Sequence, residues 1–178
     1  ILLPLLIRRR DRAVGRREDG KGSSVMLVFF GCIGVGFMLV EMVTIHKLGV
    51  FLANPVISVS AVITSILVFS GVGSTLQGRI PFPPGRRIGI SGIAVVVLFG
   101  ISLLVFDPFV NLLAGGGLPV RFAASIFFTA PYSFFMGWFF ASGIEILHRS
   151  GVDEAIPLAW GINGFASVAA APLATLLS

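Results

Sequence analysis

Residues 34–78 read GVGFMLVEMVTIHKLGVFLANPVISVSAVITSILVFSGVGSTLQG, two long apolar runs that meet at Asn54-Pro55. Each run has the length of about 20 residues that a helix needs to cross a bilayer. Pro55 can occupy the first turn of a new helix, where its missing N–H is not needed. The stretch therefore predicts two spanning helices joined by a short turn.

The composition places the whole chain in the same class. Of its 178 residues, 56% are hydrophobic and only 12% are charged, which excludes an ordinary soluble domain. The formal charge of +5 comes from short Lys and Arg clusters, which suit loops beside anionic lipid headgroups better than a nucleic-acid surface. We predict an all-α, polytopic integral membrane bundle whose partner is the lipid bilayer and not nucleic acid.

Similar apolar runs recur along the chain and predict about five transmembrane helices. We expect the spans at residues 25–52, 55–78, 88–106, 121–147 and 157–178. Residues 1–24 begin with ILLPLLI and continue with an arginine-rich run, which we interpret as the end of a preceding segment followed by a solvated basic loop. The chain starts without Met and stops within an apolar pattern, so we expect the remainder of a longer polypeptide as a partner.

The distribution of Lys and Arg predicts an orientation. With the first loop inside, the cytoplasmic loops hold seven, three and one of these residues, whereas the opposite side keeps Lys47 and Arg121. Loops rich in Lys and Arg stay in the cytoplasm. We therefore predict a multi-pass protein of the cell membrane with the basic loop in the cytoplasm.

Glu41 is the strongest chemical candidate. A charged residue at the centre of a span costs about 2.5 to 3.5 kcal/mol on insertion scales, so it normally faces protein or water. On a helical period Glu41 shares a stripe with Gly31 and Gly34, which we expect to pack against another helix. Two interpretations stay open: a packing acid that is protonated or hydrogen-bonded to a neighbouring serine, and a ligand or proton site.

Small and hydroxylated side chains recur every three or four residues in the second span. Such a seam is typical of close helix packing, and the alternative is the lining of a substrate path. Asn163 lies on a similar stripe of the last span. We expect packing at Gly71, Ser74 and Gly78, and we add Ser60, Thr64 and Asn163 to Glu41 as candidates for a ligand or proton site.

A second acid, Glu145, falls near the end of the fourth span, and Arg79 follows the second. We predict that they form an ion pair at the same membrane depth, with independent contact to headgroup water as the alternative. The sequence holds no phosphate-binding loop, metal-spaced His or Cys set, or Ser-His-Asp arrangement. We expect no cofactor and no metal, and no catalytic site is recognisable, so enzyme activity stays an open question.

Four segments carry a resemblance to a known family: GFMLVEMVTIHKLGVFLANPV, LVFSGVGSTLQGRI, APYSFFMGWFFASGIEIL and AWGINGFASVAAAPLATLL. In this order they resemble the membrane region of bacterial spermidine-synthase-like proteins, in which a major-facilitator-like region is fused to a synthase-like domain. The matching positions are residues 38–41, 52–55, 70–79 and 160–164. The chain departs from the family at Ala53-Asn54-Pro55, where a Gly-His-Pro-like turn is usual, and at residues 137–140, where a Met-Pro-Phe-Pro-like break is usual.

The resemblance implies a membrane location and a transport-like or polyamine-related context. The synthase-like nucleotide-binding domain is not within these residues, so its chemistry cannot be assigned to them. We expect the membrane domain of a spermidine-synthase-like or transporter-like protein that moves or senses a small cationic metabolite at Glu41. The alternatives are a membrane anchor for an aminopropyltransferase-like or methyltransferase-like enzyme domain outside this chain, and a purely structural bundle.

Overall fold

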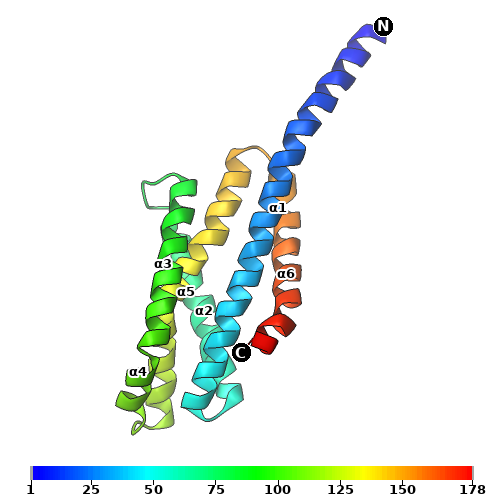
Figure 1. Ribbon diagram of the computed structural model, residues 1–178. Helices are drawn as coiled ribbons and strands as arrows, with labels where there is room; N and C mark the ends of the chain where they lie inside the picture. The colour runs from blue at the N-terminus through cyan, green and yellow to red at the C-terminus, as the bar shows by residue number, and fades with distance from the viewer. Residues whose placement is uncertain (1, 178) are drawn as a thin grey trace.

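The computed structural model describes residues 2–177, and side chains from Val25 to Leu173. Over these residues the chain is 89% helical and has no strand. Its elements are the helices α1 (Leu2–Leu52), α2 (Pro55–Gln77), α3 (Pro84–Leu104), α4 (Phe106–Leu113) and α5 (Leu118–Arg149), the short 3₁₀ helix η1 (Asp153–Ala155), and α6 (Ile156–Leu177) (Figure 1). Among the described residues, five helices are long and apolar enough to cross a membrane, which confirms the predicted all-α membrane bundle.

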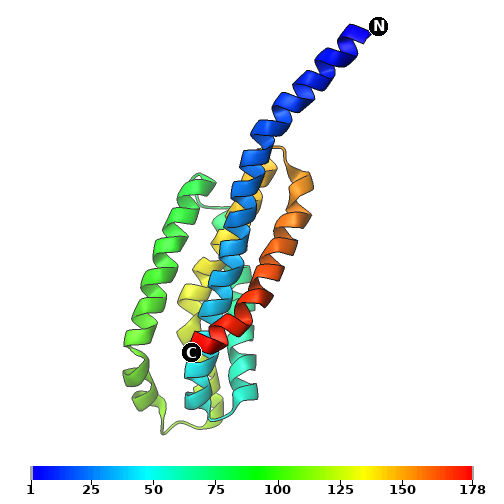
Figure 2. The same ribbon diagram turned by 45° about the vertical axis from the view of Figure 1, so that its right-hand side comes forward.

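The helix α5 is the centre of the bundle. It packs against α1, α2 and α3, whereas α6 packs mainly along α1. Figure 2 shows α6, in orange and red, beside the blue part of α1. We call the end of the bundle with residues 78–83 and 150–155 the basic end, and the opposite end, with residues 53–54 and α4, the far end (Figure 1).

The turn between α1 and α2 follows directly from its sequence. The Asn54 side chain accepts hydrogen bonds from the backbone N–H groups of Val56 and Ile57, at 3.0 and 3.2 Å, and so caps α2. Pro55 takes the first turn of α2, as predicted. Ala53 has a positive φ of 53°, which reverses the chain within two residues.

Two segments outside the predicted spans are helical. Residues 8–24 are part of α1 and do not form the expected loop. Arg, Lys, Glu and Ala have high helix propensity, each Gly costs only about 1 kcal/mol relative to Ala, and an adjoining span supplies the nucleus for this extension. Most of α4 also lies outside the predicted spans, and its residues Phe109, Val110 and Leu113 pack against the core of the far end.

Two helices begin earlier than predicted. The helix α3 starts at Pro84 instead of residue 88, and α5 starts at Leu118 instead of residue 121. In both helices a proline lies in the first turn, where its fixed φ suits the helix and its missing N–H has no intrahelical partner to lose. Pro84 and Pro119, which lie outside the predicted spans, therefore belong to the starts of these helices.

The helices α2 and α5 make the closest backbone approach. A Cβ atom built on Gly137 would lie 2.0 Å from the carbonyl oxygen of Ser70, and one on Gly73 would lie 2.0 Å from that of Phe134. Only glycine fits at both positions. Small residues that let backbones approach are the usual basis of helix association in membranes.

Candidate functional site

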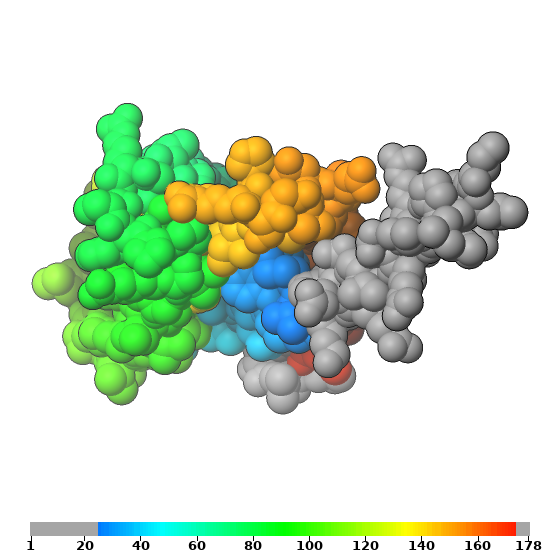
Figure 3. All heavy atoms as spheres, turned by 90° about the horizontal axis from the view of Figure 1, so that it is seen from above, coloured from blue at the N-terminus to red at the C-terminus, as the bar shows by residue number. Residues whose placement is uncertain are grey.

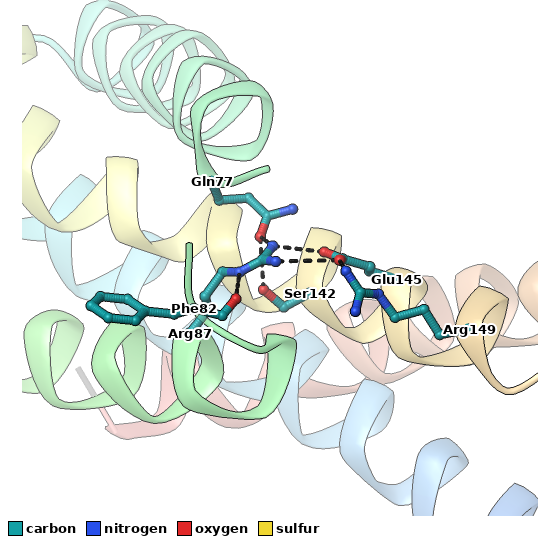
Figure 4. Close-up of polar contacts among 6 residues, drawn as sticks. All are labelled: Gln77, Phe82, Arg87, Ser142, Glu145 and Arg149. Atoms are coloured by element: carbon teal, nitrogen blue, oxygen red, sulfur yellow. Dashed lines mark hydrogen bonds and ion pairs between the residues drawn. The ribbon is translucent and has the colours of Figure 1, made fainter. Parts of the chain in front are cut away.

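The basic end holds a network of buried polar side chains around Arg87. The Arg87 side chain is 4% exposed and lies in the first turn of α3. Its Nη1 and Nη2 donate to the two carboxylate oxygens of Glu145, at 2.7 and 3.2 Å, and its Nε donates to the carbonyl oxygen of Phe82 at 2.7 Å. Figure 4 shows the guanidinium between Glu145 and Gln77, whose Oε1 also accepts from Nη1.

The same network continues on α5. Ser142 Oγ donates to Gln77 Oε1 at 3.1 Å, and Arg149 Nη2 lies 2.6 Å from Glu145 Oε1. Arg149 is 63% exposed, so Glu145 is held between one buried and one exposed cation. All three guanidinium nitrogens of Arg87 have acceptors, and four of the five N–H groups are used, so this network joins α2, α3 and α5.

The predicted pair of Arg79 and Glu145 does not form. Arg79 is exposed in the turn after α2, and Glu145 pairs with Arg87 and Arg149 instead. The prediction failed because α3 was expected to start after Arg87. Since α3 begins at Pro84, Arg87 is carried on a helix that packs on α5, and a buried arginine requires a carboxylate partner.

Glu41 is half-buried within the first span. No hydrogen bond or ion pair joins it to any group in the part of the chain whose side chains the structure describes. The serine partner that a packing acid would use is therefore not provided within these residues. Glu41 and Glu145, the carboxylates of the apolar spans Val25–Leu52 and Leu118–Arg149, differ sharply in this respect.

The glycines on the Glu41 stripe lie against α6. A Cβ on Gly34 would be 2.3 Å from the carbonyl oxygen of Asn163, and Ser167 Oγ donates to the carbonyl oxygen of Gly34 at 3.1 Å. Gly31 faces Ile162 at a looser 3.7 Å. Asn163 meets α1 through its backbone, while its side-chain Oδ1 is buried without a hydrogen-bond partner.

The predicted seam of α2 is not its packing face. Gly71 and Gly78 are exposed with open space in front of them, Ser60 and Thr64 are exposed, and Ser74 is half-buried and bonds to its own helix. Small residues occur on two faces of α2, so their spacing alone did not distinguish the faces. The buried face consists of Ser58, Ala61, Val62, Ser65, Gly73 and Gln77.

Hydroxyl groups explain why the other face of α2 is buried. Ser58 Oγ donates to the carbonyl oxygen of Ile45 on α1, and Ser65 Oγ donates to that of Ile126 on α5, both at 2.9 Å. Ser60, in contrast, bonds to the carbonyl oxygen of Val56 in its own helix. Among the described side chains, no hydrogen bond connects Ser60, Thr64 or Asn163 with Glu41, and their role as candidates for a ligand or proton site stays a prediction.

A second polar contact lies nearer the far end. Thr44 Oγ1 and Tyr132 Oη are 3.1 Å apart, and both side chains are buried. Beside them is a cavity of about 10 Å³, also lined by Lys47, whose ammonium group lies 4.8 Å from the centre of the Phe106 ring. A space of this size holds about one water molecule. The Thr44–Tyr132 contact could not be predicted from the sequence, because 88 residues separate the two side chains.

Metal binding has no support within the described part of the chain, where no three His, Cys, Asp or Glu side chains come together. Comparison of the sequence and the structure with protein families, with curated proteins and with solved structures finds no match. The resemblance to spermidine-synthase-like membrane regions therefore stays a hypothesis, which rests on the quoted segments alone.

Proposed function

We propose that this chain is the membrane domain of a spermidine-synthase-like or transporter-like protein and that it binds a small cation or a proton at Glu41. The observation that carries the proposal is the contrast between the two carboxylates. Glu145 is neutralised by Arg87 and Arg149, whereas Glu41 has no partner among the described residues. An unpaired acid inside a span is expensive, and such acids commonly belong to ion or proton pathways.

The position of Glu41 supports this function. It is half-buried, so an ion that reaches it is partly removed from water. In such surroundings the attraction between a carboxylate and a cation is stronger than in bulk water. We further propose that the basic end faces the cytoplasm, because Arg79, Arg86 and Arg149 lie there and the far end carries Lys47 and Arg121.

Spermidine is the direct probe of the cation site, because the proposal and the family resemblance both concern a small organic cation. Purified protein in an uncharged detergent is titrated with spermidine by calorimetry. Infrared spectra collected across a pH series follow the protonated carboxyl band. We expect saturable spermidine binding or a titrating carboxyl band that Glu41→Gln abolishes.

Glu154→Gln is the matched control, because it also removes one negative charge but from an exposed position in η1. This variant should behave as the wild type. If Glu41→Gln folds and keeps the wild-type spermidine binding and carboxyl band, Glu41 is a packing residue and the proposed site is wrong.

A membrane anchor for a soluble enzyme domain is the second candidate. It is favoured by the network that fixes α2, α3 and α5 to one another at the basic end, where an attached domain would need a rigid base. In a full-length protein with such a domain, Glu41→Gln would leave the transferase rate unchanged. A loss of that rate in Glu41→Gln would instead connect the acid to the enzymatic reaction.

A further inference from the structure

An apolar groove runs between α1, α3 and α5. It has a volume of about 410 Å³ and is lined by hydrophobic side chains of all three helices, among them Ile33 and Phe37 of α1, Val96 of α3 and Met136 of α5. Both α1 and α3 pack on α5, but they have at most marginal contact with each other. The groove is therefore open on the side away from α5, within the apolar length of the helices.

Two glycines make room for an occupant. Gly36 of α1 lines the groove, and a Cβ built on it would meet no atom within 4 Å. Gly92 of α3 lines the opposite wall beside the ring of Phe139. The volume falls in the range of sites that take small ligands, and the lining suits a hydrocarbon chain.

One end of the groove lies close to the basic end. Phe29 lines the groove, and its ring would be 2.7 Å from a Cβ on Gly143 of α5. Gly143 precedes Glu145 by two residues, which is about 3 Å along a helix. The groove therefore ends within about one helical turn of the Arg87 network. In Figure 3, which looks onto the basic end, α3 (green), the start of the α1 span (blue) and the end of α5 (orange) surround this region.

Two arginines with N–H groups free for further hydrogen bonds lie at the basic end. Arg149 is 63% exposed and meets Glu145 through one nitrogen, Nη2. Arg86 is exposed, and its guanidinium lies 4.6 Å from the centre of the Phe82 ring with no acidic partner in the described part of the chain. A negative headgroup is the complement of this charge.

We propose that the groove binds an acyl chain of an anionic phospholipid and that Arg86 and Arg149, the exposed cations at this end, attract its negative headgroup. A hydrocarbon chain fills a long apolar groove between helices, and the headgroup then falls at the depth of the two arginines. A transmembrane helix of a partner would cover the groove but would leave the guanidinium group of Arg86 without an anion. The proposal is independent of the function suggested for Glu41.

Photocrosslinking tests the position of the chain. Purified protein in nanodiscs receives a trace of phosphatidylglycerol with a diazirine in one acyl chain, and the crosslinked peptides are identified by mass spectrometry. We expect crosslinks concentrated in residues 29–40 and 92–96. Gly36→Leu should abolish most of them, because its side chain enters the groove without meeting the backbone of another helix. The matched control is Gly71→Leu, which adds the same side chain at an exposed site of α2 with equally open space.

Headgroup recognition is tested with the same diazirine chain on phosphatidylcholine. The wild type should prefer phosphatidylglycerol, and the variants Arg86→Gln and Arg149→Gln should each reduce this preference by about fivefold. Arg121→Gln, at the far end, should leave the preference unchanged. Equal labelling by the two lipids would overturn the headgroup assignment. Labelling spread evenly over the exposed helices, or none in the groove, would overturn the acyl-chain site and favour annular lipid or a protein partner there.

Discussion

Arg87 of α3 and Glu145 of α5 are joined by two hydrogen bonds, of 2.7 and 3.2 Å, across 58 residues of sequence. The pair connects the start of one span with the end of another. Arg149 shares the same carboxylate from an exposed position four residues later on α5. Glu145 therefore takes part in one buried and one exposed ion pair. Comparing variants of the two pairs measures how burial changes their contribution to the free energy of unfolding.

Glu145→Ala should destabilise the bundle by about 3 kcal/mol, because it leaves the buried guanidinium of Arg87 without its counter-charge. Arg149→Ala should cost less than about 1 kcal/mol, since it removes an exposed pair between residues one helical turn apart. Unfolding by a denaturing detergent, followed by Trp138 and Trp160 fluorescence, measures both values. Equal effects of the two substitutions would show that burial of Arg87 is unimportant.

Gly137→Ala should loosen the contact between α2 and α5. Its new Cβ would lie 2.0 Å from the Ser70 carbonyl oxygen, which belongs to backbone and cannot rotate away. We expect a loss of about 2 kcal/mol, typical of overpacking. Gly71→Ala is the control, because it lies in the same pair of helices but faces open space, and it should be neutral or stabilising by up to about 1 kcal/mol. An unchanged stability of Gly137→Ala would contradict the close approach of α2 and α5.

Gly34→Ala should separate α6 from α1. A Cβ there would be 2.3 Å from the Asn163 carbonyl oxygen, so the helices must move apart and the hydrogen bond from Ser167 to Gly34 is strained. The expected result is faster hydrogen exchange in α6 with little change in α2 and α5. Gly36→Ala, two residues later but with open space in front of it, should leave the exchange of α6 unchanged. Equal hydrogen-exchange rates of α6 in the two variants would contradict the contact of α6 with Gly34.

Tyr132→Phe should remove the hydroxyl contact with Thr44 without a change in shape. Interhelical hydrogen bonds in membrane proteins contribute about 0.6 kcal/mol on average. A double-mutant cycle with Thr44→Val isolates this term from the bond that Thr44 makes to its own helix at Val40. We expect a coupling free energy near the average value, and zero coupling would show that the two hydroxyls do not interact.

The number of spans could be predicted from the sequence because a bilayer requires every backbone group of a span to be satisfied within its own helix. A long apolar run in a membrane protein of this kind therefore predicts a spanning helix. The Asn54-Pro55 turn could also be predicted, since both residue types have specific roles at helix starts. The helix at residues 8–24 could not be predicted, because composition alone does not distinguish a solvated basic loop from a helix that continues a neighbouring span.

Side-chain partners were harder to predict than helices. The face of α2 that meets α5 could not be chosen, because Ser and Gly lie on both faces and only the partner backbone decides between Ser65 and Thr64. Arg87 was missed as the partner of Glu145 because α3 was expected to start after it. The helix starts at Pro84 instead, since proline suits the first turn of a helix. Glu41 was identified from its sequence position, but its lack of a partner required the packing of the other helices.

Membrane topology is the most direct test of the whole account, because the five spans place the basic and far ends on opposite sides. Cys32 is first replaced by Ala, and single cysteines are then introduced as Gly20→Cys and Ser150→Cys near the basic end and Gly116→Cys at the far end. An impermeant maleimide applied to intact cells should label Gly116→Cys, and label the other two variants only after permeabilisation. The reverse pattern would keep the bundle and contradict the proposed orientation. Labelling of Gly116→Cys together with Ser150→Cys in intact cells would contradict the five-span bundle itself.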